Sequence, residues 1–208
     1  MVERSQWVEI TDEDPTHSQR YIERFRTMAE AGRDLAGEAR LIDAMAPRSA
    51  RILDAGCGPG RVGSTLAELG HEVVGVDVDP VLIAEAQREH PGATWLVGDL
   101  AELDLPAVGV AADFDVIVCA GNVMTFLAPS TRSLVVSRLG AHLADGGRLV
   151  VGFGADLSGP GAHQAVFHQV GEPYAVAGAY FVGLFQKGYG VQFFSVDRNR
   201  HTLIKCDL

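Results

Sequence analysis

The sequence is poor in the features that mark secreted, membrane-bound or metal-binding proteins. It has three cysteines in 208 residues (Cys57, Cys119 and Cys206), whose number and spacing suit neither a disulfide framework nor a metal site. The first residues are polar and acidic, without the apolar segment of a secretory signal. No uncharged apolar run approaches the ~20 residues that a membrane helix needs. We therefore predict a cytoplasmic protein that has no resident metal and no membrane partner.

Positive charge is also scarce. The chain has 17 basic and 27 acidic residues, a net charge of -10, which argues against sequence-independent binding to the phosphates of a nucleic acid. A small or basic partner fits this charge better. With 47% hydrophobic residues, the chain is long enough for one α/β domain with a substantial core.

Glycine is abundant in one informative place, the segment 51–60. A short apolar run ends there at Asp54, and Gly56, Gly58 and Gly60 follow at every second position. Glycine accepts positive φ and has no Cβ, so such a loop can turn tightly and let a ligand touch main-chain N–H groups. The helix that follows directs its positive end toward the same ligand. The segment therefore predicts a ligand-binding loop between a strand and a helix.

The spacing of these residues indicates which ligand is meant. The dinucleotide fingerprint requires a small residue at the position that Arg61 occupies here. The pattern D-x-G-x-G-x-G instead resembles motif I of the class I S-adenosylmethionine-dependent methyltransferases, whose loop holds the methionyl end of the cofactor. The resemblance implies an α/β fold, with a Rossmann-like, doubly wound, mostly parallel sheet and helices on both faces. It also implies S-adenosyl-L-methionine as the cofactor.

Two more carboxylates follow predicted strands. Asp77 ends the strand at 72–76, about 20 residues after the loop, where an acidic side chain accepts hydrogen bonds from both ribose hydroxyls of a nucleoside. This position suits NAD equally well, and a turn or cap carboxylate is the alternative. Asp99 and Leu100 follow the strand at 94–97. In the resembled family, an aspartate there accepts from the adenine amino group, and the next main-chain N–H meets the ring.

The fourth predicted strand, at 113–119, is followed by the loop 120–127. In the family this loop borders the sulfonium and the substrate, so Gly121 would permit close approach and Asn122 would offer a polar group. Asparagine is also a good turn former, which leaves a structural role open. Ser130 is predicted to cap a helix that buries four hydrophobic residues, namely Leu134, Val135, Leu139 and Leu143. A fifth strand is predicted at 148–153.

The N-terminal 50 residues are predicted to form a helical cap. Residues 1–15 are expected to be mobile, and Thr16 with Gln19 has the form of a capping box. Such helices often close over the cofactor in the family, so Tyr21 and Arg24 would reach the binding cleft. The alternative is a packing role for Tyr21 and a solvated Arg24. A second helix is expected to run from about residue 34 to the residue before Pro47.

The C-terminal part departs from the family's usual ending, which puts the far wall of the substrate pocket in doubt. We predict a short helix at 162–170 and an antiparallel hairpin of strands 179–185 and 191–196 around the loop 187–190. His163 and His168 have no carboxylate neighbours and are interpreted as ordinary polar residues. The predicted division is a helical cap (1–50), a cofactor-binding core (51–155) and an atypical C-terminal part (156–208).

Together these features predict an S-adenosylmethionine-dependent methyltransferase that acts on a small-molecule acceptor. A non-catalytic binder of S-adenosylmethionine or S-adenosylhomocysteine remains an alternative, as does a nicotinamide-dependent oxidoreductase. The sequence nominates no catalytic residue. The predicted cofactor-binding residues are Tyr21, Asp54, Gly56, Gly58, Gly60, Asp77, Val78, Asp99, Leu100 and Asn122.

Overall fold

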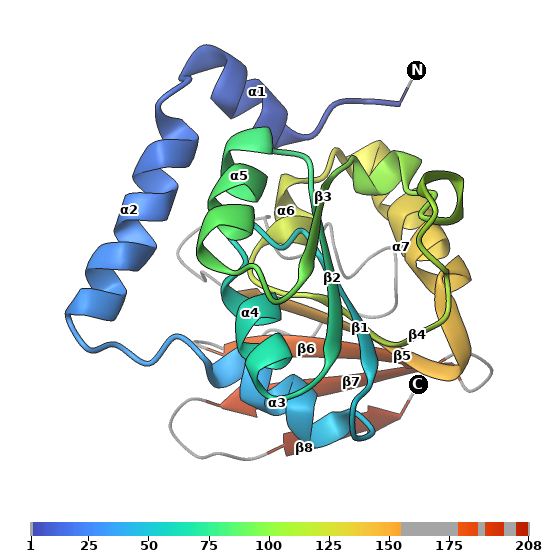
Figure 1. Ribbon diagram of the computed structural model, residues 1–208. Helices are drawn as coiled ribbons and strands as arrows, with labels where there is room; N and C mark the ends of the chain where they lie inside the picture. The colour runs from blue at the N-terminus through green and yellow to red at the C-terminus, as the bar shows by residue number, and fades with distance from the viewer. Residues whose placement is uncertain (1, 155–178, 187–189, 198–202, 208) are drawn as a thin grey trace.

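The computed structural model describes residues 2–154, 179–186, 190–197 and 203–207 (Figure 1). Its strands form one sheet in the order β3-β2-β1-β4-β5-β6-β7-β8, and β1 to β5 pair in parallel. The predicted Rossmann-like, mostly parallel sheet is therefore confirmed. The parallel strands are β1 (Arg51–Ala55), β2 (Glu72–Asp77), β3 (Thr94–Val97), β4 (Phe114–Cys119) and β5 (Leu143–Gly154).

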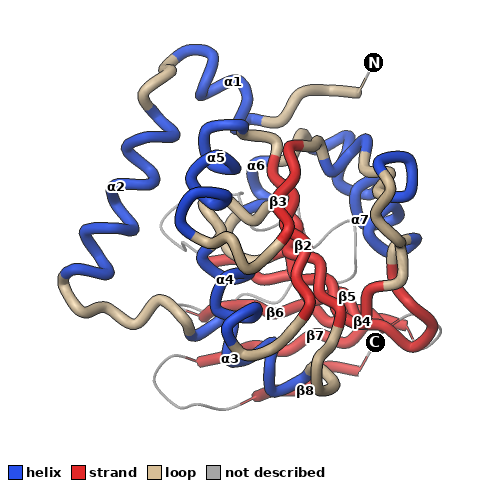
Figure 2. Tube along the Cα trace, in the orientation of Figure 1, coloured by secondary structure: helices blue, strands red, loops and turns tan. Residues whose placement is uncertain are grey.

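Helices cover both faces of the parallel sheet because alternate strand residues point to opposite sides (Figure 2). Ile52 packs with residues of α3 and α4 on one face, whereas Leu53 packs with Val135 and Leu139 of α7 on the other. The helices are α1 (Gln6–Glu13), α2 (His17–Glu30), α3 (Gly37–Met45), α4 (Arg61–Glu68), α5 (Pro80–Glu89), α6 (Val123–Phe126) and α7 (Arg132–Ala141). None of the helices in the described residues is long and apolar enough to span a membrane.

Beyond β5 the described strands are antiparallel. They are β6 (Ala179–Gln186), β7 (Gly190–Asp197) and β8 (Leu203–Asp207). The predicted helix at 162–170, His163, His168 and the hairpin loop at 187–189 lie outside the described residues. The C-terminal hairpin and the three-part division of the chain therefore stay predictions.

The prediction that residues 1–15 are mobile is wrong. The segment forms α1, whose first turn is capped by the Ser5 hydroxyl accepting from the Val8 N–H at 3.3 Å. The indole of Trp7 is 8% exposed and fixes the helix to the domain. Burial of the Trp7 side chain against the rest of the domain thus stabilises α1, although the segment is acidic and polar.

Four other sequence-based assignments also need correction. Thr16 precedes α2, but its side chain caps nothing, because its hydroxyl donates to Asp14 Oδ1 at 2.6 Å. Ser130 donates instead to Glu3, and α7 begins after Thr131. Leu134 is 40% exposed, whereas Val135 and Leu139 of the same predicted face are buried. The fifth strand begins at Leu143, with a register shift against β4, rather than at residue 148.

Candidate active site at the carboxyl ends of the strands

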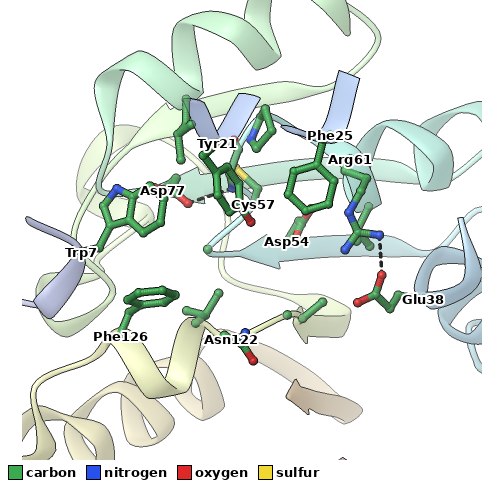
Figure 3. A pocket seen from close by; sticks show the side chains of 18 of the residues that line it. Trp7, Tyr21, Phe25, Glu38, Asp54, Cys57, Arg61, Asp77, Asn122 and Phe126 are labelled. Atoms are coloured by element: carbon green, nitrogen blue, oxygen red, sulfur yellow. Dashed lines mark hydrogen bonds and ion pairs between the residues drawn. The ribbon is translucent and has the colours of Figure 1, made fainter. Parts of the chain in front are cut away.

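A cavity of about 1050 Å³ opens at the carboxyl ends of β1, β2 and β3 (Figure 3). The glycine loop, α2 and the start of α6 form its walls. The predicted site residues that line it are Tyr21, Asp54, Gly56, Gly58, Asp77, Val78, Asp99, Leu100 and Asn122. Gly60 is not among the lining residues. The fold therefore gathers all the predicted positions except Gly60 around one space, although their contacts with a ligand stay predictions.

The order of the strands explains this gathering. Since β3, β2 and β1 are neighbours and run in parallel, their carboxyl ends meet at one edge of the sheet. Asp54 lies near the end of β1, Asp77 ends β2, and Asp99 follows β3. Three carboxylates from separate parts of the sequence thus line the rim of one cavity.

Asp54 is mainly a structural link between β1 and α4. Its side chain is buried, and its Oδ2 accepts the Gly63 N–H at 2.8 Å. Burial raises the pKa of Asp54 to about 7, although the bond from Gly63 opposes that shift. The carboxyl group therefore exchanges its proton near neutral pH while it holds the first turn of α4 against the sheet.

The raised pKa of Asp54 makes the free energy of unfolding pH-dependent. Between pH 4 and 7 the folded state holds a proton that the unfolded chain has lost, so this group makes stability fall as pH rises, by on the order of 4 kcal/mol. Asp54→Asn mimics the protonated form, so we expect a flatter profile and a stability at pH 8 at least equal to that of the wild type. Urea unfolding from pH 5 to 8 measures both; a less stable variant at pH 8 would contradict this reading.

Asp77 holds the glycine loop in place. Its Oδ2 accepts the Gly58 N–H at 2.8 Å and its Oδ1 accepts the Asp79 N–H at 2.9 Å. A carboxylate has about four acceptor positions, so capacity remains for hydroxyl groups of a ligand. Burial raises the pKa of Asp77 to about 6. The group is therefore mostly ionised at neutral pH and can accept from a diol.

Most N–H groups of the glycine loop do not face the cavity. Gly56 and Cys57 both donate to the Val76 carbonyl, at 2.8 and 3.1 Å, and Gly60 donates to the Cys57 carbonyl at 3.0 Å. Together with Gly58, whose N–H is bound to Asp77, these groups already have partners within the protein, and their contact with a ligand stays a prediction. The loop instead contributes space: Gly56, Gly58 and Gly60 all have positive φ and lack side chains.

Gly60 serves packing behind the loop. A Cβ at this position would lie 3.0 Å from Trp95 Cη2, and one at Gly63 would lie 2.9 Å from the same atom. The buried indole of Trp95 occupies a slot made by glycines and is fixed by its Nε1 donating to the His90 carbonyl at 2.8 Å. Packing against Trp95 is therefore enough to explain why the third position of the motif is a glycine.

Asp99 and Asn122 occupy the remaining sides of the rim. Asp99 Oδ1 accepts the Ala101 N–H at 2.8 Å and caps a short 3-10 helix, Leu100–Glu102. Asn122 precedes α6, after Gly121 with φ of +71°. A Cβ on Gly56 would overlap the side chain of Val123, so α6 sits directly on the glycine loop. The loop after β4 thus closes the cavity opposite α2.

Sequence reasoning missed an aromatic cover over the cavity. Trp7 makes edge contacts with Tyr21 and Phe126, at centroid distances of 5.2 and 5.3 Å, and all three line the cavity (Figure 3). Trp7 Nε1 donates to Asp79 Oδ2 at 2.8 Å, and Ser18 also donates to that oxygen. A tryptophan just after a capping serine was the available sequence signal for this docked helix.

Arg61, the residue that departs from the dinucleotide pattern, also lines the cavity. Its guanidinium pairs with Glu38, donates to the Leu35 carbonyl at 2.6 Å and lies 5.4 Å from the centre of the Phe25 ring (Figure 3). These contacts fasten α4 to α3, which bears Glu38, and to Leu35 in the segment before it. Arg61 therefore has a structural role that a small residue at this position lacks.

Removing the Trp7 indole is expected to release α1. In Trp7→Ala the buried ring contacts and the bond to Asp79 are lost, so amide hydrogens of residues 8–13 should exchange at least tenfold faster. Hydrogen exchange followed by mass spectrometry measures this, with Val8→Ala on the same helix as the control. Unchanged exchange in Trp7→Ala would show that other contacts hold the helix.

The cavity offers no reactive thiol. Burial raises the pKa of Cys119 to about 12 and raises that of Cys57 well above its ordinary value. Among the residues that the structure describes, no group of three His, Cys, Asp or Glu side chains is arranged to hold a metal ion. The lining described above suits binding, orientation and exclusion of water.

Comparisons with known proteins agree with this geometry. Residues 52–147 match the family described as methyltransferase domain. The crystal structure of a TehB-like SAM-dependent methyltransferase from Corynebacterium glutamicum is 42% identical, with a TM-score of 0.70 over 83% of this chain and 98% of that chain.

Curated relatives match over a shorter stretch. An uncharacterized methyltransferase of Mycobacterium tuberculosis is 35% identical over 53% of this chain and 54% of its own length. The magnesium-protoporphyrin O-methyltransferase of Rhodobacter capsulatus is 31% identical over 59% and 53%, respectively. The chain thus spans about half the length of the curated relatives it matches. The fold, the rim of carboxylates and the match to the Corynebacterium structure, which covers 98% of that chain, agree. The chain belongs to the class I S-adenosylmethionine-dependent methyltransferases.

Proposed function

We propose that this protein binds S-adenosyl-L-methionine in the cavity and transfers its methyl group to a small-molecule acceptor. The observation that carries the proposal is Asp77, which holds the glycine loop with two hydrogen bonds and keeps acceptor positions for a ribose diol. Asp99 and Leu100, at the end of the neighbouring strand, suit the adenine. The side-chain-free surface of Gly56 and Gly58 suits the methionyl end.

The chain's own residues would act by position. The cofactor supplies an already activated methyl group on a sulfonium, so no nucleophile of the protein is required. Tyr21, Trp7 and Phe126 would cover the cofactor and exclude water, and Asn122 would border the acceptor. Holding two reactants in line can provide effective molarities of ~10⁵ to 10⁸ M, which is the contribution this site can make.

A small acceptor is favoured over a nucleic acid by the net charge of -10. The names of two relatives support this choice: magnesium-protoporphyrin O-methyltransferase and a trans-aconitate 2-methyltransferase of Methylobacterium nodulans, which is 35% identical over 60% of this chain. A cytoplasmic location belongs to the same proposal and rests on the sequence composition.

Two measurements test the proposal. Calorimetric titration should show one molecule of S-adenosylhomocysteine bound per chain and no binding of NAD, because Arg61, held by Glu38, occupies the position where a dinucleotide loop needs a small residue. Incubation with S-adenosylmethionine and a panel of small molecules should then yield S-adenosylhomocysteine. Binding without turnover on any acceptor would favour a non-catalytic binder, and preferential binding of NAD would favour an oxidoreductase.

A further inference from the structure

One carboxylate joins both N-terminal helices to the core of the domain. Asp79 lies just after β2 and is 5% exposed. Its Oδ1 caps α5 by accepting the Val81 N–H at 2.8 Å. Its Oδ2 accepts the Nε1–H of Trp7, on α1, at 2.8 Å and also the hydroxyl of Ser18, on α2. A single oxygen atom thus holds one donor from each helix.

The carboxylate of Asp79 has no cationic partner within the described part of the chain. It is satisfied by N–H and O–H donors, two of which come from α1 and α2. Hydrogen bonds to an ionised acceptor are about twice as strong as those between neutral groups. Removal of one donor leaves a buried oxygen with fewer partners, which costs more than the loss of an exposed bond. The bonds to Asp79 therefore contribute strongly to the docking of both helices.

The same turn of the chain carries the candidate ribose site. Asp77 Oδ1 accepts the Asp79 N–H at 2.9 Å, so the two carboxylates are joined through the main chain. Asp77 and Val78 line the cavity, whereas Asp79 does not. Val78 packs with Trp7 and Leu82 in one hydrophobic cluster. Asp79 thus lies behind the ribose site, where its side chain bonds to α1, α2 and α5.

Docking of α1 on Asp79 fixes the aromatic cover over the cavity. The Trp7 ring contacts Tyr21 and Phe126 at centroid distances of 5.2 and 5.3 Å (Figure 3). Tyr21 in turn lies over the glycine loop, with its Cε1 3.8 Å from where a Cβ on Gly58 would be. If α1 undocked, the indole N–H would lose its acceptor and the cover would lose its central ring. The cavity is therefore covered on this side while Trp7 is bound to Asp79.

We propose that Asp79 is a positioning residue that locks the two N-terminal helices over the bound cofactor and thereby slows its release. The inference rests on the proposed function, in which the ribose of the cofactor meets Asp77. Since the turn 77–79 serves both the ribose and α1, cofactor binding and helix docking should stabilise each other by the same free energy. Exclusion of water from the reacting sulfonium depends on the same cover.

The test measures how fast bound S-adenosylhomocysteine leaves the protein. Tritiated compound is released into an excess of unlabelled compound from wild type, Asp79→Ser, Trp7→Phe and the double variant. A serine keeps the cap of α5 but cannot also hold both helices, and a phenylalanine keeps an aromatic ring without the N–H donor. The matched control is Asp104→Ser. Asp104 is exposed, accepts the Ala107 N–H at 3.2 Å and does not line the cavity.

Asp79→Ser should release the compound about tenfold faster than wild type. Trp7→Phe should release it about threefold faster, because Ser18 keeps its acceptor in that variant. The double variant should match Asp79→Ser, since both substitutions remove the same bond. Association rates should change little, and Asp104→Ser should match wild type throughout.

Tryptophan fluorescence gives a second readout, because Trp7 and Trp95 are the two tryptophans of the chain. Trp95 lies behind the glycine loop and is 4% exposed, so a change in acrylamide quenching reports on Trp7. S-adenosylhomocysteine should lower the quenching in wild type but not in Asp79→Ser. A general loss of stability would not produce this dependence on the ligand.

Two results would overturn the inference while the wild type still binds S-adenosylhomocysteine. One is release from Asp79→Ser and Trp7→Phe at the wild-type rate. The other is a double variant whose acceleration is the product of the two single ones, because the two residues would then act independently. If the wild type binds no S-adenosylhomocysteine, the proposed function fails, and this inference fails with it.

Discussion

Asp77→Ala is expected to weaken binding of S-adenosylhomocysteine by about 1 to 3 kcal/mol. The substitution removes the acceptor for ribose hydroxyls and also leaves the N–H groups of Gly58 and Asp79 without their carboxylate. Both effects reduce affinity, the first directly and the second by loosening the glycine loop. Calorimetric titration of wild type and variant at pH 7.5 gives the difference in binding free energy.

Two controls test the role of Asp77. Asp113→Ala removes an exposed carboxylate just before β4, at the opposite end of the sheet, and should leave the affinity unchanged. Burial raises the pKa of Asp77 to about 6, so wild-type affinity should rise as pH increases through 6 and the carboxyl group ionises. This pH dependence should vanish in Asp77→Asn. Equal affinities of wild type and Asp77→Ala would disprove the ribose assignment.

Gly75→Ala is expected to destabilise the domain by about 3 kcal/mol. Gly75 lies in β2, and a Cβ there would overlap the indole ring of Trp95 and lie 3.0 Å from Cys57 Sγ. The indole has little freedom to move because its Nε1 is bonded to the His90 carbonyl. Inserting a methyl group therefore forces strain on a buried, tightly packed layer directly behind the glycine loop.

Urea unfolding measures this loss. Gly92→Ala is the control, since Gly92 has nothing within 4 Å of an added Cβ and should change stability by less than about 0.5 kcal/mol. In a double-mutant cycle, Gly75→Ala combined with Trp95→Leu should lose less stability than the sum of the two single losses, because the smaller side chain makes room for the methyl group. If Gly75→Ala were as stable as wild type, the indole would not occupy the slot described here.

The parallel half of the fold could be predicted from the sequence because its signals are local. The apolar runs of the strands, the glycine loop and the Asp79–Pro80 start of α5 each lie within one short segment, and Asp79 caps that helix. The rim of carboxylates followed from one topological rule, that parallel strands end at the same edge.

The parts that sequence reasoning missed depend on contacts between distant segments. Trp7 is docked by Asp79, 72 positions away, and no local pattern announces such a bond. The close packing of Trp95 on Gly60 cannot be read from the spacing of the glycines alone. Internal hydrogen bonding of Gly56, Cys57 and Gly58 was hidden for the same reason, since the acceptors of these N–H groups lie on β2.

The central claim is that one nucleoside lies along the ends of β1, β2 and β3. A crystal structure of the protein with S-adenosylhomocysteine tests it most directly. We predict both ribose hydroxyls within hydrogen-bond distance of Asp77, the adenine beside Asp99 and Leu100, and the homocysteine moiety along Gly56 and Gly58. A ligand bound elsewhere, or a ribose turned away from Asp77, would contradict the account.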